Sequence, residues 1–214
     1  MQDLEIIKNL KIFEGLNDNE LIEINKYLLP QKNYKSKEII FNIGDPVNYF
    51  GILLEGQVDL SIEDAFGNKT ILSKLTAPAL FAESVLIKEV EEIPLSVVAM
   101  TDVKIIFFDY KSYKSKNLSS KDKVQENLIK ILANKNLFMR DKLNLLSLST
   151  SREKILYFLS TESRKKHSKY FTIDFNISEL AQFLNLNRSS LSRELSKLKK
   201  EGLIDYDKKT FRIL

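Results

Sequence analysis

The sequence predicts an α+β fold: an N-terminal antiparallel β-roll or jelly roll, then a long helix, then a C-terminal winged helix-turn-helix. Short apolar-polar alternations separated by turn residues run from 34 to 108 and indicate strands. One uninterrupted helical pattern covers 119–146, and two short helices with a hairpin are indicated over 176–214. We therefore expect a β-roll domain over 1–118, a separate long helix, and a winged helix-turn-helix domain over 147–214.

The N-terminal part combines a helical leader with many short strands. Apolar residues at helical spacing over 3–29, ended by Pro30, predict one or two short helices that only pack. From Tyr34 onward apolar residues recur at every second position, which is the spacing of a strand. Turns are expected at 44–46 and 67–68. Short strands at this close spacing are typical of an antiparallel barrel or jelly roll.

The long helix has two apolar seams. The seam that contains one polar residue consists of Ile129, Leu132, Asn136, Met139, Leu143 and Leu146. The second seam, which we expect to cover the β-roll, consists of Val124, Leu128, Ile131, Phe138 and Leu145. A lone Asn in an apolar seam suits the register of a symmetric helix pair, so we expect a homodimer. The alternative is an ordinary core helix with a partly exposed Asn136.

The C-terminal part contains two short helices joined by the polar turn 185–187, followed by a hairpin after Gly202. The outer face of the second helix mixes short hydroxyls with long cations, and the hairpin has lysines at its tip. This composition suits a helix in a DNA major groove, with arginines at base edges and serines near phosphates. The alternative is a solvated helix face. The residues expected to contact DNA are Arg188, Ser189, Ser190, Ser192, Arg193, Ser196, Lys200, Lys208 and Lys209.

Charge is distributed unevenly along the chain. Residues 147–214 contain 14 Lys and Arg against 8 Asp and Glu, a net charge of +6, whereas the remainder has 19 against 21, or −2. A basic C-terminal third is typical of a nucleic-acid-binding module. The chain has no cysteine, signal peptide or apolar run of about 18–20 residues, so we expect a cytoplasmic protein with no membrane contact.

Residues 176–204 resemble the C-terminal domain of Crp/Fnr-type transcription regulators, whose pattern runs "selAxxlgvsRetvSRxLxxLexeGlI". Residues 37–60, KEIIFNIGDPVNYFGILLEGQVDL, are similar to the N-terminal half of a cyclic-nucleotide-binding β-roll. The resemblance covers nearly the whole chain in the same domain order. It implies a homodimeric regulator that binds a palindromic operator in double-stranded DNA, contacts RNA polymerase and senses a signal through its β-roll.

In the family's recognition helix, a glutamate that accepts a hydrogen bond from cytosine follows the first arginine. Aligned residue by residue, Arg188 and Arg193 match the family's two arginines, and Ser192 matches a serine found in some members. Ser189 stands where the glutamate is expected. The resemblance therefore implies an operator that differs from the family's common half-site at one base pair.

The family's ligand site lies in a cassette of Phe-Gly-Glu followed about ten residues later by Arg-Ser. The residues that correspond to this pocket are Phe81, Ala82, Glu83, Ser84, Ile93, Pro94, Met139 and Arg140. The glutamate is retained, where it would take a ribose hydroxyl or be held by turn amides. The cation for the cyclic phosphate is missing, so we expect a signal other than cyclic AMP. The alternative is a cyclic-nucleotide-responsive regulator in which Arg140 supplies that cation.

An enzyme is not expected. A cupin-like metalloenzyme is a remote alternative, but His167 is the only histidine, and such a metal site needs several His and carboxylate ligands. No Walker loop, dinucleotide fingerprint or G-x-S-x-G nucleophile motif is present. We therefore expect no catalytic residues, metal site or cofactor, and leave open haem or another small effector.

Overall fold

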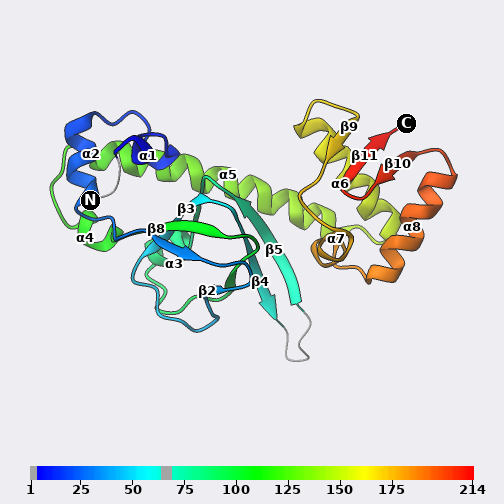
Figure 1. Ribbon diagram of the computed structural model, residues 1–214, viewed down its shortest axis with the longest axis horizontal. Helices are drawn as coiled ribbons and strands as arrows, with labels where there is room; N and C mark the ends of the chain where they lie inside the picture. Colours follow the sequence, from blue (N-terminus) through cyan, green and yellow to red (C-terminus); the bar gives the residue numbers. More distant parts are fainter. Residues whose placement is uncertain (1–3, 64–68) are drawn as a thin grey trace. The chain divides into compact units, whose positions relative to one another are not determined.

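The computed structural model describes residues 4–63 and 69–214, with the side chain of Lys69 excepted (Figure 1). The chain divides into two compact units, one of residues 1–62 and 72–136 and one of residues 63–71 and 137–214. The turn expected at 67–68 lies outside the described residues. Within the described ranges, no helix is long and apolar enough to cross a membrane.

The first unit contains a helical leader and a β-roll. Its short helices are α1 (Leu4–Lys8), η1 (Lys11–Phe13), α2 (Asp18–Asn25), α3 (Glu83–Ile87) and α4 (Tyr110–Lys114). The strands of the roll are β1 (Lys32–Tyr34), β2 (Ile39–Phe41), β3 (Phe50–Glu55), β4 (Gln57–Glu63), β5 (Lys69–Thr76), β6 (Ala79–Phe81), β7 (Ser96–Ala99) and β8 (Val103–Phe108). The last residue of β4 and the first three of β5 are counted with the second unit. The leader and the strands are in the order that the sequence predicts.

The strands form two four-stranded sheets, with the orders β1-β8-β3-β6 and β2-β7-β4-β5. Every described register is antiparallel, as a roll of consecutive short strands requires. β3 and β8 are central in their sheet and almost wholly buried, since the leader helices pack on this sheet as well. Phe13 of η1, for example, meets Phe108 of β8 edge to face at 5.7 Å between ring centroids.

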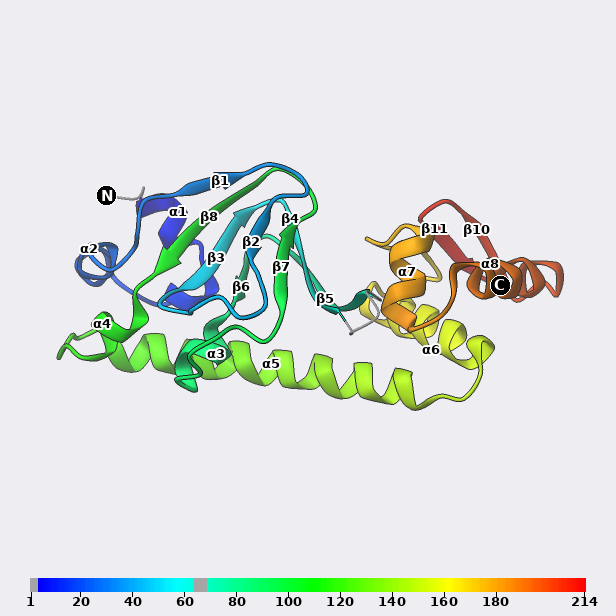
Figure 2. The ribbon, with the colours of Figure 1, turned by 90° about the horizontal axis from the view of Figure 1, so that it is seen from below.

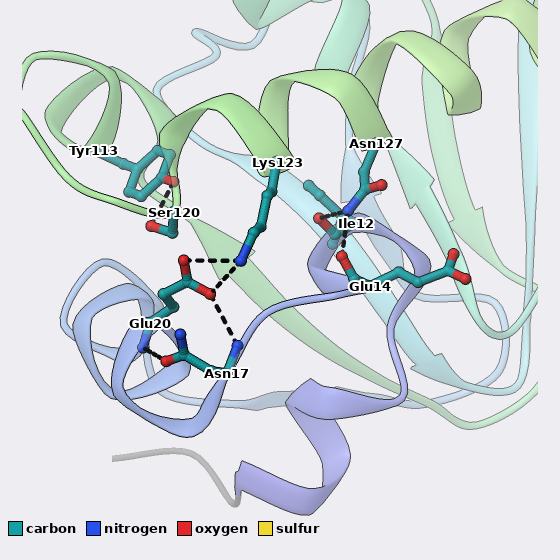
Figure 3. Close-up of polar contacts among 8 residues, drawn as sticks. All are labelled: Ile12, Glu14, Asn17, Glu20, Tyr113, Ser120, Lys123 and Asn127. Atoms are coloured by element: carbon teal, nitrogen blue, oxygen red, sulfur yellow. Dashed lines mark hydrogen bonds and ion pairs between the residues drawn. The ribbon is translucent and has the colours of Figure 1, made fainter.

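The long helix α5 (Lys121–Ser147) is tied to the leader by polar contacts (Figure 3). The Lys123 ammonium lies 3.0 Å from the buried Glu20 carboxylate. Asn127 donates through Nδ2 to the carbonyls of Ile12 and Glu14, at 3.2 and 2.9 Å. The amide thus supplies donors to one carbonyl of the buried residue Ile12 and to one carbonyl at the edge of the leader. The start of α5 is therefore held in one orientation against its own unit.

The second apolar seam of α5 does not cover the β-roll along its whole length. Val124, Leu128 and Ile131 pack into the core of the first unit, as expected. Phe138 and Leu145 instead join the core of the second unit. The expectation was wrong for these two residues because α5 continues past residue 136, where the chain passes into the second unit.

The second unit is a winged helix-turn-helix. Its elements are α6 (Ser151–Lys165), β9 (Tyr170–Thr172), α7 (Ile177–Leu184), α8 (Arg188–Lys200), β10 (Ile204–Asp207) and β11 (Thr210–Ile213). The three strands form an antiparallel sheet in the order β10-β11-β9. Complete capping boxes at Thr150 and Asn176 begin α6 and α7, and Gly202, at φ +72°, follows the end of α8.

Candidate nucleic-acid interface and ligand cassette

The geometry of the α7–α8 pair follows from its turn and its apolar faces. Asn185 ends α7 in the left-handed conformation, at φ +52°, which asparagine tolerates better than most residues. Leu184 of α7 and Leu191 and Leu195 of α8 are completely buried in one cluster. With this apolar stripe fixed inward, the opposite face of α8 must point to solvent.

The side chains expected to contact DNA lie on that outward face or on the hairpin tip. Ser190 is half-buried, and the other eight residues are exposed. The Ser196 hydroxyl donates to the carbonyl of Ser192 at 2.9 Å. Across the described part of the chain, no hydrogen bond or ion pair engages the side chains of these cations: Arg188, Arg193, Lys200, Lys208 and Lys209.

Several other cations of the second unit are paired. Arg152 contacts the carboxylates of Glu194 in α8 and of Glu201 at the C-cap of α8. Lys165 pairs with Glu162, and Lys199 pairs with Asp205. The outer face of α8 and the hairpin tip together carry five cations whose side chains have no described hydrogen bond or ion pair. This arrangement can attract a polyanion without first breaking internal ion pairs.

The hairpin tip is a two-residue turn. Asp207 of β10 pairs with Thr210 of β11, so Lys208 and Lys209 form the turn itself. Lys208 has φ +52°, and both lysine side chains are exposed. The register places the two charges at the outermost point of the sheet.

A buried lysine, Lys142, holds the end of α7. Its ammonium donates to the carbonyl of Phe183 in the last turn of α7, where backbone carbonyls lack helical partners. Burial lowers the pKa of Lys142 to about 7. Sequence reasoning missed this residue, although its spacing gives a signal: Lys142 follows Phe138 by four positions and precedes Leu145 by three, on the buried face.

In the first unit, the predicted ligand cassette begins where β6 ends. The ring of Phe81 packs so closely on β3 that a Cβ at Gly51 would lie 2.0 Å from its Cζ. Ala82 follows at φ +63°, in the left-handed region that the family's glycine adopts without steric penalty. The strained conformation is retained although alanine stands there, at a cost of about 1–2 kcal/mol.

Glu83 is paired with a lysine of α5. Its carboxylate is buried, with a residue exposure of 1%. Lys135 Nζ lies 2.7 Å from Glu83 Oε1 and donates to the carbonyl of Leu80, also at 2.7 Å. Glu83 Oε2 is buried and has no hydrogen-bond partner among the described residues. Figure 2 shows α3, which begins at Glu83, beside α5.

This pairing corrects one alternative from the sequence. The donor to Glu83 is the Lys135 ammonium, not a turn amide. The Arg140 guanidinium, which the sequence offered as a cation for the cyclic phosphate, is exposed and pairs with Asp141 at 3.0 Å. That alternative stays a prediction. Sequence reasoning missed Lys135, although it occupies the buried seam four residues after Ile131.

The other residues assigned to the pocket differ in burial. Phe81, Ala82 and Ile93 are buried. Ser84 and Pro94 are exposed on the first unit, and Met139 is exposed on the part of α5 that belongs to the second unit. The first unit thus brings the Phe-Ala-Glu corner and Ile93 into its own core, with Lys135 as the counter-ion of Glu83.

Comparisons with known families agree with this architecture. A sequence model of the cyclic nucleotide-binding domain matches residues 31–116, and a model of the Crp-like helix-turn-helix domain matches residues 148–214. A search of curated protein sequences finds no match.

Solved structures share the fold. The catabolite activator protein of Thermus thermophilus is 26% identical, with 95% of this chain and 93% of that chain covered and a TM-score of 0.55. The c-di-GMP-responsive regulator CLP of Xanthomonas campestris is 16% identical, with coverages of 92% and 99% and a TM-score of 0.77. A CooA mutant from Carboxydothermus hydrogenoformans is 17% identical, with coverages of 95% and 94% and a TM-score of 0.75.

A β-roll followed by a long helix and a winged helix-turn-helix defines a class of DNA-binding regulators. Both family matches occur in that order along the chain. The chain belongs to the Crp/Fnr family of transcription regulators.

Proposed function

We propose that the protein is a homodimeric regulator whose two α8 helices recognise a palindromic operator in double-stranded DNA. The observation that carries the proposal is the outer face of α8, where exposed serines lie among arginines and lysines that have no described internal partner. The N-cap residue of α8, Asn187, makes no side-chain cap bond. The first-turn amides of α8 are therefore available to an anion. Contact with RNA polymerase at the bound operator belongs to the same proposal.

The exposed seam of α5 supports the homodimer. Ile129 and Leu143 are 66% and 65% exposed, and Met139 is also exposed. Leu132 and Leu146 are half-buried, and Asn136 lies exposed among these apolar side chains. A contiguous apolar stripe in solvent is unfavourable, and a second copy of the same stripe would cover it. Facing Asn136 side chains would then set the register of the pair.

The proposed readout is tested by two substitutions. Arg193→Ala should weaken operator binding by roughly 1–3 kcal/mol and relax the preference at one base pair, since a bidentate arginine contact is lost. Lys208→Ala should weaken binding to all DNA sequences alike. It should also reduce the slope of log affinity against log salt concentration by about one. Selection from a random DNA pool, followed by affinity measurements over a salt series, measures both effects.

The same selection tests the predicted operator. We expect half-sites about one helical turn, ~34 Å, apart. The base pair that the family's glutamate contacts should differ from the common half-site, because the shorter hydroxyl of Ser189 cannot replace a carboxylate. Recovery of the common half-site unaltered, or full selectivity in Arg193→Ala, would show that the assigned face of α8 is wrong.

We further propose that the β-roll senses a signal other than cyclic AMP. In support, Glu83 is engaged by Lys135, and Ile93 and Pro94 stand where a phosphate-binding arginine and serine are expected. A cyclic phosphate would lose a charge-assisted bond there and face an apolar side chain. A ribose hydroxyl would also have to share the Glu83 carboxylate with Lys135.

Calorimetry with cyclic AMP and cyclic GMP tests this proposal. We expect binding weaker than millimolar, or none, because Ile93 and Pro94 provide no cation where the family's arginine stands and Lys135 occupies Glu83 Oε1. Arg140→Ala should leave the titration unchanged. Micromolar binding by the wild type would contradict the proposal, and loss of that binding in Arg140→Ala would restore Arg140 as the phosphate ligand.

A further inference from the structure

We infer that Arg152 is a positioning residue for DNA recognition, which holds α8 along one flank and partly offsets the charge of the two carboxylates on that flank. The inference rests on the proposed function. It concerns a residue that touches α8 and has no part in the exposed recognition face.

The contacts of Arg152 span two turns of α8. Arg152 is the second residue of α6, and its Nη1 lies 3.4 Å from Glu194 Oε1. Its Nη2 lies 2.6 Å from Oε2 of Glu201, the residue at the C-cap of α8. Glu194 and Glu201 are seven residues apart, and two helical turns bring them to the same side. One planar guanidinium therefore links two points along α8, which opposes both rotation and sliding of the helix on α6.

The two carboxylates stand beside the recognition face. Glu194 is the only acidic residue between Arg188 and Lys200. It follows Arg193 directly, so its side chain points about 100° away from that of Arg193 around the helix. A carboxylate at this place repels DNA phosphates unless a cation neutralises it. The Arg152 guanidinium contacts both carboxylates, and its hydrogen bond lowers the pKa of Glu201.

The geometry argues against a direct phosphate contact by Arg152. Both terminal nitrogens are already engaged by carboxylates. Arg188 and Arg193, by contrast, are exposed and have no described side-chain partner. Arg152 therefore acts on DNA through α8.

The test compares Arg152→Gln in two backgrounds of the full-length protein, wild type and Glu194→Gln/Glu201→Gln. Affinity for the operator selected by wild type is measured over a salt series, with thermal melting to show that each variant is folded. In the wild-type background we expect roughly tenfold weaker binding, equal to about 1.4 kcal/mol. In the double-glutamine background the same change should alter affinity by less than about twofold, because the groups through which Arg152 acts are gone.

Arg164→Gln is the matched control. Arg164 is an exposed arginine at the other end of α6, and its one described side-chain bond is to Thr161 in the preceding turn. Arg164→Gln removes the same charge from the same helix, but at a residue that does not touch α8. We expect it to change operator affinity by less than about twofold. Arg152→Gln should also lower selectivity at the base pair assigned to Arg193, whereas Arg164→Gln should not.

Two results would overturn the inference, and a third would overturn the proposed function on which it rests. Equal losses in both backgrounds, with a salt slope smaller by about one, would make Arg152 a phosphate contact. A loss no larger than that of Arg164→Gln would leave Arg152 without a role in recognition. Absence of sequence-specific binding by wild type would instead refute the proposed function itself. If Arg152→Gln does not fold, Arg152→Lys replaces it, since lysine keeps the charge but lacks the fork that reaches both carboxylates.

Discussion

The double substitution Leu132→Glu/Leu143→Glu is expected to convert the protein into monomers that no longer hold the operator. Both leucines lie in the exposed seam of α5, and Leu143 is 65% exposed. In the proposed dimer, carboxylates would replace apolar contacts on both copies and face like charges across the two-fold axis. A monomer contacts one half-site only, so operator affinity should fall by roughly 10²–10⁴. Sedimentation and DNA-binding titrations measure the two effects.

Asn134→Glu/Asn144→Glu is the control for this prediction. Both asparagines are exposed on α5 outside the seam, so the variant carries the same added charge on the same helix. It should remain dimeric and bind the operator with only a small loss from its added negative charge. A tight dimer in Leu132→Glu/Leu143→Glu would show that the seam is not the interface.

The second large effect is expected from Lys135→Met, which leaves the buried carboxylate of Glu83 without its cation. Breaking a buried ion pair by removing one partner costs roughly 3–5 kcal/mol. We expect about 3 kcal/mol of lost stability here, the lower end, because the Lys135 side chain is 33% exposed. Denaturant unfolding measures the loss. Adding Glu83→Gln should recover part of it, since a neutral amide is less costly to bury than a carboxylate.

Lys130→Met provides the comparison on the same helix. Lys130 pairs with Glu126 at 2.8 Å, and both side chains are exposed. Surface pairs of this kind contribute less than about 1 kcal/mol, so stability should hardly change. If Lys135→Met is no more destabilising than Lys130→Met, the pair with Glu83 does not hold the cassette.

Much of the site could be predicted because local spacing decides it. The stripe on α8 follows from helical periodicity once Leu191, Leu195 and Leu198 are taken as the inward face. The lysines of the hairpin tip follow from a two-residue turn between two strand patterns. These features depend on neighbours within about ten residues, where the chain's own geometry determines which side chains share a face.

The second, buried seam of α5 shows what residue spacing predicts and what it does not. Residues 124, 128, 131, 135, 138, 142 and 145 repeat at intervals of four and three, with lysines at the fourth and sixth places. Sequence analysis took only the apolar members. The structure buries Lys142 and places the ammonium of Lys135 on a buried carboxylate, because partners at those two positions supply a carbonyl and an acid.

The sequence by itself determined the order of the parts, the strands of the roll, the helix-turn-helix and the outward face of α8. Tertiary structure alone decided the ion pairs between distant elements. Lys135 meets Glu83 across 52 residues, and Arg152 meets Glu194 and Glu201 across 42 and 49. Periodicity assigns a side chain to a face of its own element, whereas the partner of a charge depends on which distant element packs against that face. The cations left unpaired on α8 are therefore a result of the fold, although their positions along the helix were plain in the sequence.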